Sequence, residues 1–232
     1  MRLFNRKINA VAIDGPAGSG KSTVARLVAA KLGYRHIDTG AMYRALTLKM
    51  MKLGVDLSRE EDIVAAMDGV NIDIFPSAGK DGGLTVTLDG EDVSAAIRAM
   101  DVTANVKHVC KIPAVREKLV AMQRKMAVSS GGSVMEGRDI GTVVLRDARY
   151  KFYLDAAFEK RVERRFMELK AKGDNVTREC VAEDLRQRDH TDKTRKVGPL
   201  KMADDAVLVD TTDLGVDEVV EIISKAVRRG LK

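Results

Sequence analysis

The sequence has few of the side chains that bind nucleic acids, metals or other thiols. Its 232 residues include no tryptophan and only five phenylalanines, four tyrosines, three histidines and two cysteines. Single-stranded nucleic acids bind by stacking bases on aromatic side chains, and no basic segment here is interleaved with aromatic residues, so we expect no nucleic-acid partner. Cys110 and Cys180 lie far apart and outside metal-ligand spacing, and we expect two buried, reduced thiols.

Long apolar runs are also missing. No stretch approaches the roughly 20 apolar residues of a membrane-spanning helix, and no apolar signal core follows the basic N-terminal residues. The sequence therefore predicts a cytoplasmic protein without a membrane partner, and a monomer is the default expectation. Lysine and arginine outnumber aspartate and glutamate by 40 to 34, and the net charge of +6 favours an anionic partner without identifying it.

Apolar strand patterns alternate with helical patterns along most of the chain. Strands are predicted at 8–13, 133–135, 150–154 and 206–209. Helices are predicted at 22–32, 42–53 and 115–128, and two more run through 162–169 and 219–227. This alternation is typical of the α/β class, in which helices flank a parallel sheet, and the chain is long enough for a single domain over residues 1–232.

Residues 71–93 interrupt this alternation. Ile72 and Ile74, and then Val86 and Leu88, alternate with other residues on either side of the turn-rich segment 80–83. The pattern predicts a small β-containing subdomain of antiparallel strands, inserted into the larger α/β domain.

One short segment has a specific chemical signature. It follows the first strand, opens the first helix and fits the pattern G-x-x-x-x-G-K-[ST] of P-loop proteins. Its residues are Gly15, Pro16, Ala17, Gly18, Ser19, Gly20, Lys21 and Ser22, followed by Thr23. The backbone amides of such a loop cradle phosphates, so we expect the segment to bind ATP, with Lys21 reaching the β- and γ-phosphates. The Ser22 hydroxyl is expected to bind Mg²⁺, with Thr23 and Asp14 as outer partners.

Switches, motors and kinases share this loop, so other segments must identify the phosphoryl acceptor. The first candidate is Asp38 and Thr39, either of which caps a predicted helix, together with Arg44 one turn inside that helix. Ordinary capping and a solvated arginine explain the same pattern, and both interpretations stay open.

Two further segments concentrate arginine and aspartate. Directly after the strand at 133–135, Arg138 is suited to clamp a phosphate and Asp139 to accept a hydrogen bond from an amine, unless the two form a structural ion pair. Near the C-terminus, Arg188, Asp192 and Arg195 fall on one helical face. That face is either part of a helical lid that grasps phosphates or a solvated surface with internal ion pairs.

The motifs together resemble those of bacterial cytidylate kinases. The matching segments, in order along nearly the whole chain, are IDGPAGSGKST, DTGAMYRA, PAVREKL, EGRDIGTVV and RDHTDKTRKVGPL. The resemblance implies the fold of a nucleoside monophosphate kinase, with a core at 1–69 and 110–232. It also implies a nucleotide-binding insertion at about 70–109 and a lid at about 186–197.

The resemblance also implies roles for single residues. The catalytic set consists of Lys21, Arg138, Arg188 and Arg195. The substrate-binding set consists of Thr39, Arg44, Lys107, Arg116, Arg138, Asp139, Arg188, Asp192 and Arg195. In the family pattern, Thr39, Arg44 and Arg138 would hold the acceptor phosphate, and Arg116 with Asp139 would read the cytosine edge.

The remaining implied contacts are to the sugar and the transferring group. Arg188 and Asp192 would contact the sugar, and Arg195, together with Arg188, would close over the transferring phosphoryl group. Lys107 stands where family members often have a small hydroxyl residue, which puts that base or sugar contact in doubt. Thr191 replaces an arginine of some relatives, so this lid is expected to hold its phosphates less tightly.

The expected activity is transfer of the γ-phosphoryl group of MgATP to CMP, and also to dCMP, with a reduced preference for UMP. Two alternatives stay open at this point. One is another P-loop kinase that phosphorylates a different small molecule. The other is a nucleotide-dependent ATPase or switch, whose ATP consumption would not depend on an acceptor.

Overall fold

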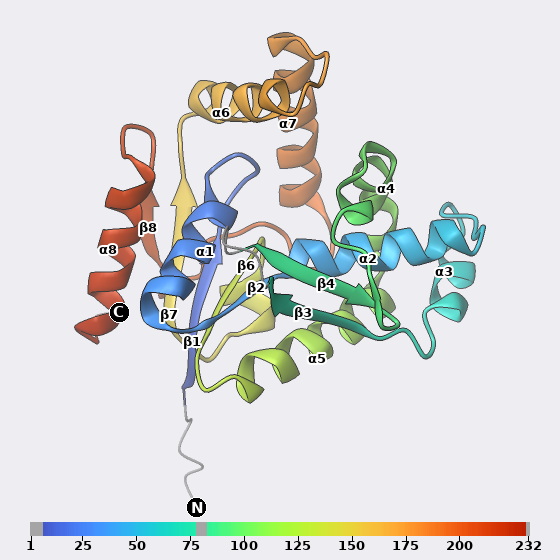
Figure 1. Cartoon of the computed structure of the whole chain (residues 1–232), viewed down its shortest axis with the longest axis horizontal. Helices are drawn as coiled ribbons and strands as arrows, with labels where there is room; N and C mark the ends of the chain where they lie inside the picture. Colours follow the sequence, from blue (N-terminus) through green and yellow to red (C-terminus); the bar gives the residue numbers. More distant parts are fainter. Residues whose placement is uncertain (1–6, 78–82, 231–232) are drawn as a thin grey trace, which may run out of the picture.

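The computed structural model describes residues 7–77 and 83–230, and its centre is a five-stranded sheet (Figure 1). The strand order is β2-β6-β1-β7-β8, and neighbouring strands are parallel throughout. The strands are β1 (Ile8–Asp14), β2 (Arg35–Asp38), β6 (Ser133–Gly137), β7 (Ala148–Asp155) and β8 (Val207–Asp210). Because the chain order reverses at β1, the loop after β1 emerges at the middle of the carboxyl edge, where such sheets bind ligands.

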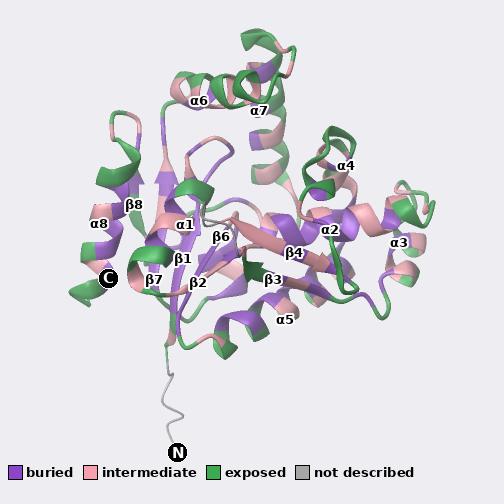
Figure 2. Ribbon diagram, viewed as in Figure 1, coloured by how far each residue is buried: buried purple, intermediate pink, exposed green. Residues whose placement is uncertain are grey.

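Helices cover both faces of this sheet, and most residues of its three inner strands, β6, β1 and β7, are therefore buried. Helices α1 (Lys21–Leu32) and α8 (Val216–Arg228) share a core with Val11 and Ile13 of β1. The alternate residues Ala10 and Ala12 belong to the opposite core, which contains α2 (Thr39–Lys52) and α5 (Pro113–Ser129). Figure 2 shows the buried strands between helices whose outer sides are exposed.

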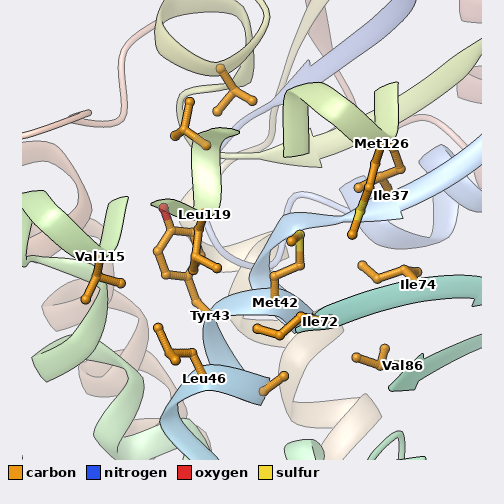
Figure 3. Packing of buried hydrophobic residues seen from close by; sticks show 14 of the residues in the cluster. Ile37, Met42, Tyr43, Leu46, Ile72, Ile74, Val86, Val115, Leu119 and Met126 are labelled. Atoms are coloured by element: carbon orange, nitrogen blue, oxygen red, sulfur yellow. The ribbon is translucent and has the colours of Figure 1, made fainter. Parts of the chain in front are cut away.

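A second, antiparallel sheet packs against α2. It has the order β3 (Ile72–Pro76), β4 (Leu84–Leu88) and β5 (Glu91–Asp92). Ile72, Ile74 and Val86 of this sheet lie in one apolar cluster with Met42 and Leu46 of α2 (Figure 3). The neighbouring elements are α3 (Glu60–Ala66), the 3₁₀ turn η1 (Ala96–Arg98) and α4 (Met100–Cys110).

Two helices extend beyond the carboxyl edge of the main sheet. They are α6 (Phe158–Ala171) and α7 (Arg178–Thr194), drawn in yellow-orange and orange at the top of Figure 1. Val162 of α6 and Val181 and Leu185 of α7 pack together with Ala17, which belongs to the loop after β1. The α6–α7 pair therefore rests directly on the predicted phosphate loop.

The predicted α/β class, the parallel sheet and the small antiparallel sheet are confirmed. Helix α2 begins at Thr39, three residues before the prediction. The predicted turn at 80–83 falls mostly outside the described residues. The prediction of two buried thiols was wrong, because Cys180 is exposed near the start of α7, although both cysteines are free. No helix in the described parts of the chain is both long and apolar enough to cross a membrane.

Candidate active site

The loop between β1 and α1 has the backbone geometry of an anion cradle. Gly15 has a φ of 152° and Gly18 a φ of 76°, which L side chains rarely adopt. A Cβ at Gly15 would also overlap the carbonyl oxygen of Leu154, so a side chain is excluded there twice over. Helix α1 begins at Lys21 directly after this loop, and its free N–H groups and dipole favour a negative charge at that position.

Lys21 is buried inside this loop. Its Nζ donates to the carbonyl oxygen of Pro16 at 2.6 Å and lies 3.3 Å from Ser19 Oγ. Burial, followed by the nearby positive charge of Arg138, lowers the pKa of Lys21 to about 7. Among the described residues no carboxylate forms an ion pair with Lys21, so its ammonium group is suited to bind a polyphosphate.

Ser22 lies beside a carboxylate that the sequence did not single out. Its Oγ donates to Glu136 Oε2 at 2.7 Å, and the other oxygen of Glu136 lies 3.1 Å from His36 Nε2. A hydroxyl and a carboxylate at the mouth of the phosphate loop are the hard oxygen donors that Mg²⁺ prefers, so these residues fit that ion. Thr23, the predicted outer partner, is exposed.

Asp14, the other predicted outer partner, is bonded to the backbone instead. Its two carboxylate oxygens accept hydrogen bonds from the N–H groups of Ile140 and Gly141, each at 2.8 Å. These residues open η2 (Ile140–Val144), a π-helical turn that follows Arg138 and Asp139. Burial raises the pKa of Asp14 to about 6 despite these two hydrogen bonds.

The start of α2 meets the end of β6. Asp38 caps α2 by accepting from the N–H of Ala41 at 3.0 Å and pairs with Arg44 at 3.1 Å. The Thr39 hydroxyl donates to the carbonyl oxygen of Glu136 at 2.7 Å. Both interpretations of this segment therefore have support, because Asp38 is the cap and Arg44 is half-buried beside it.

Arg138 and Asp139, the neighbouring pair in the sequence, are not joined to each other by any ion pair among the described residues. Arg138 Nε instead donates to Asp192 Oδ2 at 2.7 Å. Asp139 pairs with Arg116 and, at 3.4 Å, with Arg195. The structure thus brings together side chains from α5, from the segment between β6 and η2, and from the C-terminal end of α7. The family resemblance would place the substrate cleft here.

Burial and the neighbouring charges shift the pKa values of these side chains. Burial raises the pKa of Asp139 even though Arg116 and Arg195 oppose that shift. Asp192 is half-buried; burial raises its pKa, but the charge and hydrogen bond of Arg138, together with the charges of Arg195 and Arg188, leave the pKa lowered. Arg188 is half-buried on α7, where burial and then Arg138 lower its pKa. This group of side chains is therefore rich in guanidinium groups, and the carboxylates of Asp139 and Asp192 neutralise them only in part.

Two other predicted positions, Lys107 and Thr191, are exposed. Lys107 is exposed in the last turn of α4, and within the described residues no hydrogen bond or ion pair connects it to the cleft. Thr191 is exposed on α7, and its hydroxyl donates to the carbonyl oxygen of Gln187.

Sequence comparison agrees with this arrangement. Residues 11–229 match the profile of the cytidylate kinase family. The chain belongs to the cytidylate kinase family. It is 49% identical over 224 residues to the cytidylate kinase of Caldanaerobacter subterraneus subsp. tengcongensis, covering 96% of each chain. It is 50% identical over 211 residues to the cytidylate kinase of Rhodococcus opacus, covering 90% of each.

A solved structure supports the fold alone. An uncharacterised protein from Eubacterium ventriosum has a TM-score of 0.50 and 14% identity, covering 96% of this chain and 99% of its own. The sequence comparison therefore confirms the predicted resemblance to cytidylate kinases, and the solved structure supports the α/β architecture.

In this member of the cytidylate kinase family, three residues that support the cleft escaped sequence reasoning. Glu136 stands within the EGRD motif, but nothing in its spacing connects it with Ser22. Gly198 has a φ of 59° and lies against the Arg116–Asp139 pair. Arg161 stands next to Val162 on α6, where the spacing of apolar residues predicted a helix but no functional residue.

Proposed function

We propose that this cytidylate kinase family member transfers the γ-phosphoryl group of ATP to CMP, and to dCMP. The observation that carries this proposal is the Arg116–Asp139 pair, which lies beside the phosphate loop at the carboxyl edge of the sheet. Cytosine has an amine donor at N4 and acceptors at N3 and O2, so one carboxylate and one guanidinium complement its edge.

A second group of side chains, one hydroxyl and two guanidinium groups, would bind the phosphate of the acceptor nucleotide. Thr39, Arg44 and Arg138 would hold it, because they follow β2 and β6 at the same edge of the sheet. Arg188 and Asp192 on α7 would contact the sugar. Lys107, at the rim, would contact the base or the sugar.

Mg²⁺ would be held by Ser22 and, in the outer shell, by Glu136. When bound, the ion neutralises charge on the β- and γ-phosphates as the bond between them breaks. The oxygen donors of these two side chains support this assignment, and Asp14 is committed to the backbone of η2 instead.

Catalysis would come from positioning and charge stabilisation. Lys21, Arg138, Arg188 and Arg195 would surround the transferring phosphoryl group, where negative charge develops on its oxygens. The acceptor is a phosphate oxygen that is already anionic, so the reaction needs no general base. Transfer is in line and passes through no covalent enzyme intermediate.

The elements around the cleft would move as substrate binds. The insertion at about 70–109 and the lid at about 186–197 would close over both nucleotides and exclude water. An open cleft would let water take the phosphoryl group, so closure protects ATP from hydrolysis.

The test of this proposal compares acceptors. We expect ADP formation from ATP and Mg²⁺ in a coupled assay to be rapid with CMP and dCMP, slower with UMP, and absent with AMP or shikimate. Activity confined to AMP or shikimate would overturn the acceptor assignment. ATP consumption that no nucleoside monophosphate changes would favour an ATPase or switch.

A substitution at Asp139 tests how the base is read. Asp139→Asn keeps the shape but replaces one acceptor oxygen with a donor, which faces the N4 amine of cytosine unfavourably and O4 of uracil favourably. We expect the ratio of kcat/KM for CMP over UMP to fall by about ten- to hundred-fold. An unchanged ratio would exclude Asp139 as the residue that reads the base.

A further inference from the structure

A buried ion pair joins the two helices that rest on the phosphate loop. Arg161 Nη1, on α6, lies 2.6 Å from Asp189 Oδ2, on α7. The side chains of Arg161 and Asp189 are 8% and 11% exposed. Neither residue is in the catalytic or substrate-binding set predicted from the sequence, although Asp189 lies within the segment RDHTDKTRKVGPL.

Arg161 also holds the phosphate loop itself. The same Nη1 donates to the carbonyl oxygen of Ala17 at 3.0 Å, and Nε donates to the carbonyl oxygen of Ala156 at 3.1 Å. In a planar trans peptide the C=O and the following N–H point in opposite directions. Fixing the Ala17 carbonyl towards Arg161 therefore turns the N–H of Gly18 away from α6, the direction required of an amide in an anion cradle.

The guanidinium group is held in orientation from a third side. It lies over the ring of Phe158 with its carbon 5.3 Å from the ring centroid, and Arg186 of α7 lies over the same ring at 5.0 Å. Such stacking restricts the plane in which the Arg161 donors point. Three neighbours thus define its position: the loop, the ring and Asp189.

On α7, Asp189 stands next to the residues proposed to contact substrate. It follows Arg188 directly and precedes Asp192 by three positions, so all three lie within about one helical turn. A bond that fixes the height and rotation of α7 at Asp189 also fixes the directions in which Arg188 and Asp192 project. Arg195 follows at the end of the same helix.

The Arg161–Asp189 ion pair is not the arrangement that would stabilise the two helices most. Asp189 Oδ1 is buried and accepts no hydrogen bond from the described residues. A buried carboxylate with one oxygen unsatisfied carries a desolvation penalty that a single ion pair does not offset well. A positioning role accounts for retaining such a pair where an apolar contact would stabilise the helices more.

We propose that Arg161 and Asp189 are positioning residues that hold α7 in register with the phosphate loop. Through this pair, the loop that binds the donor phosphates determines where Arg188, Asp192 and Arg195 meet the transferring group. The inference rests on the proposed phosphoryl transfer, but it concerns residues that touch no substrate themselves.

The geometry predicts unequal effects for the two partners. Asp189→Asn leaves the bond from Arg161 to Ala17, so calorimetry should find MgATP binding close to that of the unchanged protein, while kcat with CMP falls about ten-fold. Arg161→Gln removes the anchor of the loop as well, so both MgATP affinity and kcat should fall. A purely structural pair would lower thermal stability without this division between affinity and kcat.

The double variant separates positioning from stability. Arg161→Gln combined with Asp189→Asn leaves no unpaired buried charge, so its thermal stability should exceed that of Arg161→Gln alone. Its kcat should nevertheless remain as low as that of Arg161→Gln, because the loop anchor is still missing. Effects on kcat that multiply in the double variant would contradict the idea that the two residues act as a unit.

A matched control exists on the outer side of the same helices. Glu163 of α6 pairs with Arg178 of α7 at 3.7 Å, and both side chains are at least half exposed. Glu163→Gln removes an α6–α7 ion pair that does not touch the loop, and its kcat and MgATP affinity should be unchanged. If the CMP assay shows no activity in the unchanged protein, the proposed function fails. If Asp189→Asn folds and keeps full kcat, the positioning role fails.

Discussion

Gly198 illustrates how a residue without a side chain supports the chemistry of its neighbours. Its φ of 59° places it in the left-handed region, and a Cβ there would overlap both the Asp139 carboxylate and the Arg116 guanidinium. The close approach of its backbone leaves these two side chains in contact with each other. Arg195 Nε in turn donates to the Gly198 carbonyl oxygen. The segment after α7 thus packs its backbone against Arg116 and Asp139, the pair proposed to read the base.

Substitution of Gly198 should therefore damage acceptor binding selectively. For Gly198→Ala we expect kcat/KM for CMP to fall by at least about ten-fold, because the methyl group must displace Asp139 or Arg116. Binding of MgATP, measured by calorimetry, should change little, since the atoms nearest to a Cβ at Gly198 belong to Asp139 and Arg116 and not to the phosphate loop.

Gly173→Ala is the matched control for this substitution. Gly173 has a φ of 84° at the end of α6, but a Cβ there would meet nothing within 4 Å. The control shares the backbone penalty, about 1 kcal/mol, and should keep full activity. Equal losses of activity in both variants would contradict the contact that Gly198 makes with the base-reading pair.

Single residues also show what the sequence could not reveal. The phosphate loop was predictable, because its function depends on a fixed local spacing of glycine, lysine and serine. Glu136 was not, because its contact with Ser22 joins positions 114 residues apart. The exposure of Cys180 was likewise not predictable, since it depends on how α7 packs rather than on the residue type.

At the scale of elements, the strongest predictions came from strands buried on both faces. Most residues of β1, β6 and β7 are buried, and all three strands were predicted. β2 escaped prediction because it is short and only Ile37 among its residues is buried. The π-helical turn η2 also escaped, because its start depends on Asp14, a residue 126 positions earlier that accepts its first N–H groups.

The burial of Asp14 beside η2, which raises its pKa, makes the stability of the fold depend on pH. A carboxyl group whose pKa is raised in the folded protein binds its proton more tightly there than in the unfolded chain. Its contribution to stability is therefore full below the unfolded pKa and disappears as pH rises through the folded pKa of about 6. Asp139 raises the pKa of Asp14 and Lys21 lowers it, so both charges are included in that value.

Asp14→Asn should remove this dependence along with one of the two hydrogen bonds. We expect the variant to be less stable than the unchanged protein, with a deficit larger by about 1 kcal/mol at about pH 5 than at about pH 7. Urea unfolding at the two pH values measures this difference. A deficit that is constant, or that grows as pH rises, would contradict the raised pKa of Asp14.

At the scale of the whole molecule, the parallel sheet brings separate motifs to one edge. The loop after β1, the start of α2 and the segment after β6 lie together because their strands are neighbours. Helix α7 reaches the same edge through Arg138–Asp192 and Arg161–Asp189. Local sequence patterns predicted each segment, but only the strand order shows that they meet. The family resemblance supplied that information before the structure did.

The central claim is that this cleft passes a phosphoryl group directly from ATP to CMP. A single-turnover experiment with enzyme in excess over γ-labelled ATP, quenched on the millisecond scale, tests it most directly. The account predicts that, with CMP and Mg²⁺, the label appears in CDP at the rate at which ATP disappears, and that Lys21→Met abolishes the transfer. Label found first on the protein, or released as inorganic phosphate regardless of CMP, would contradict it.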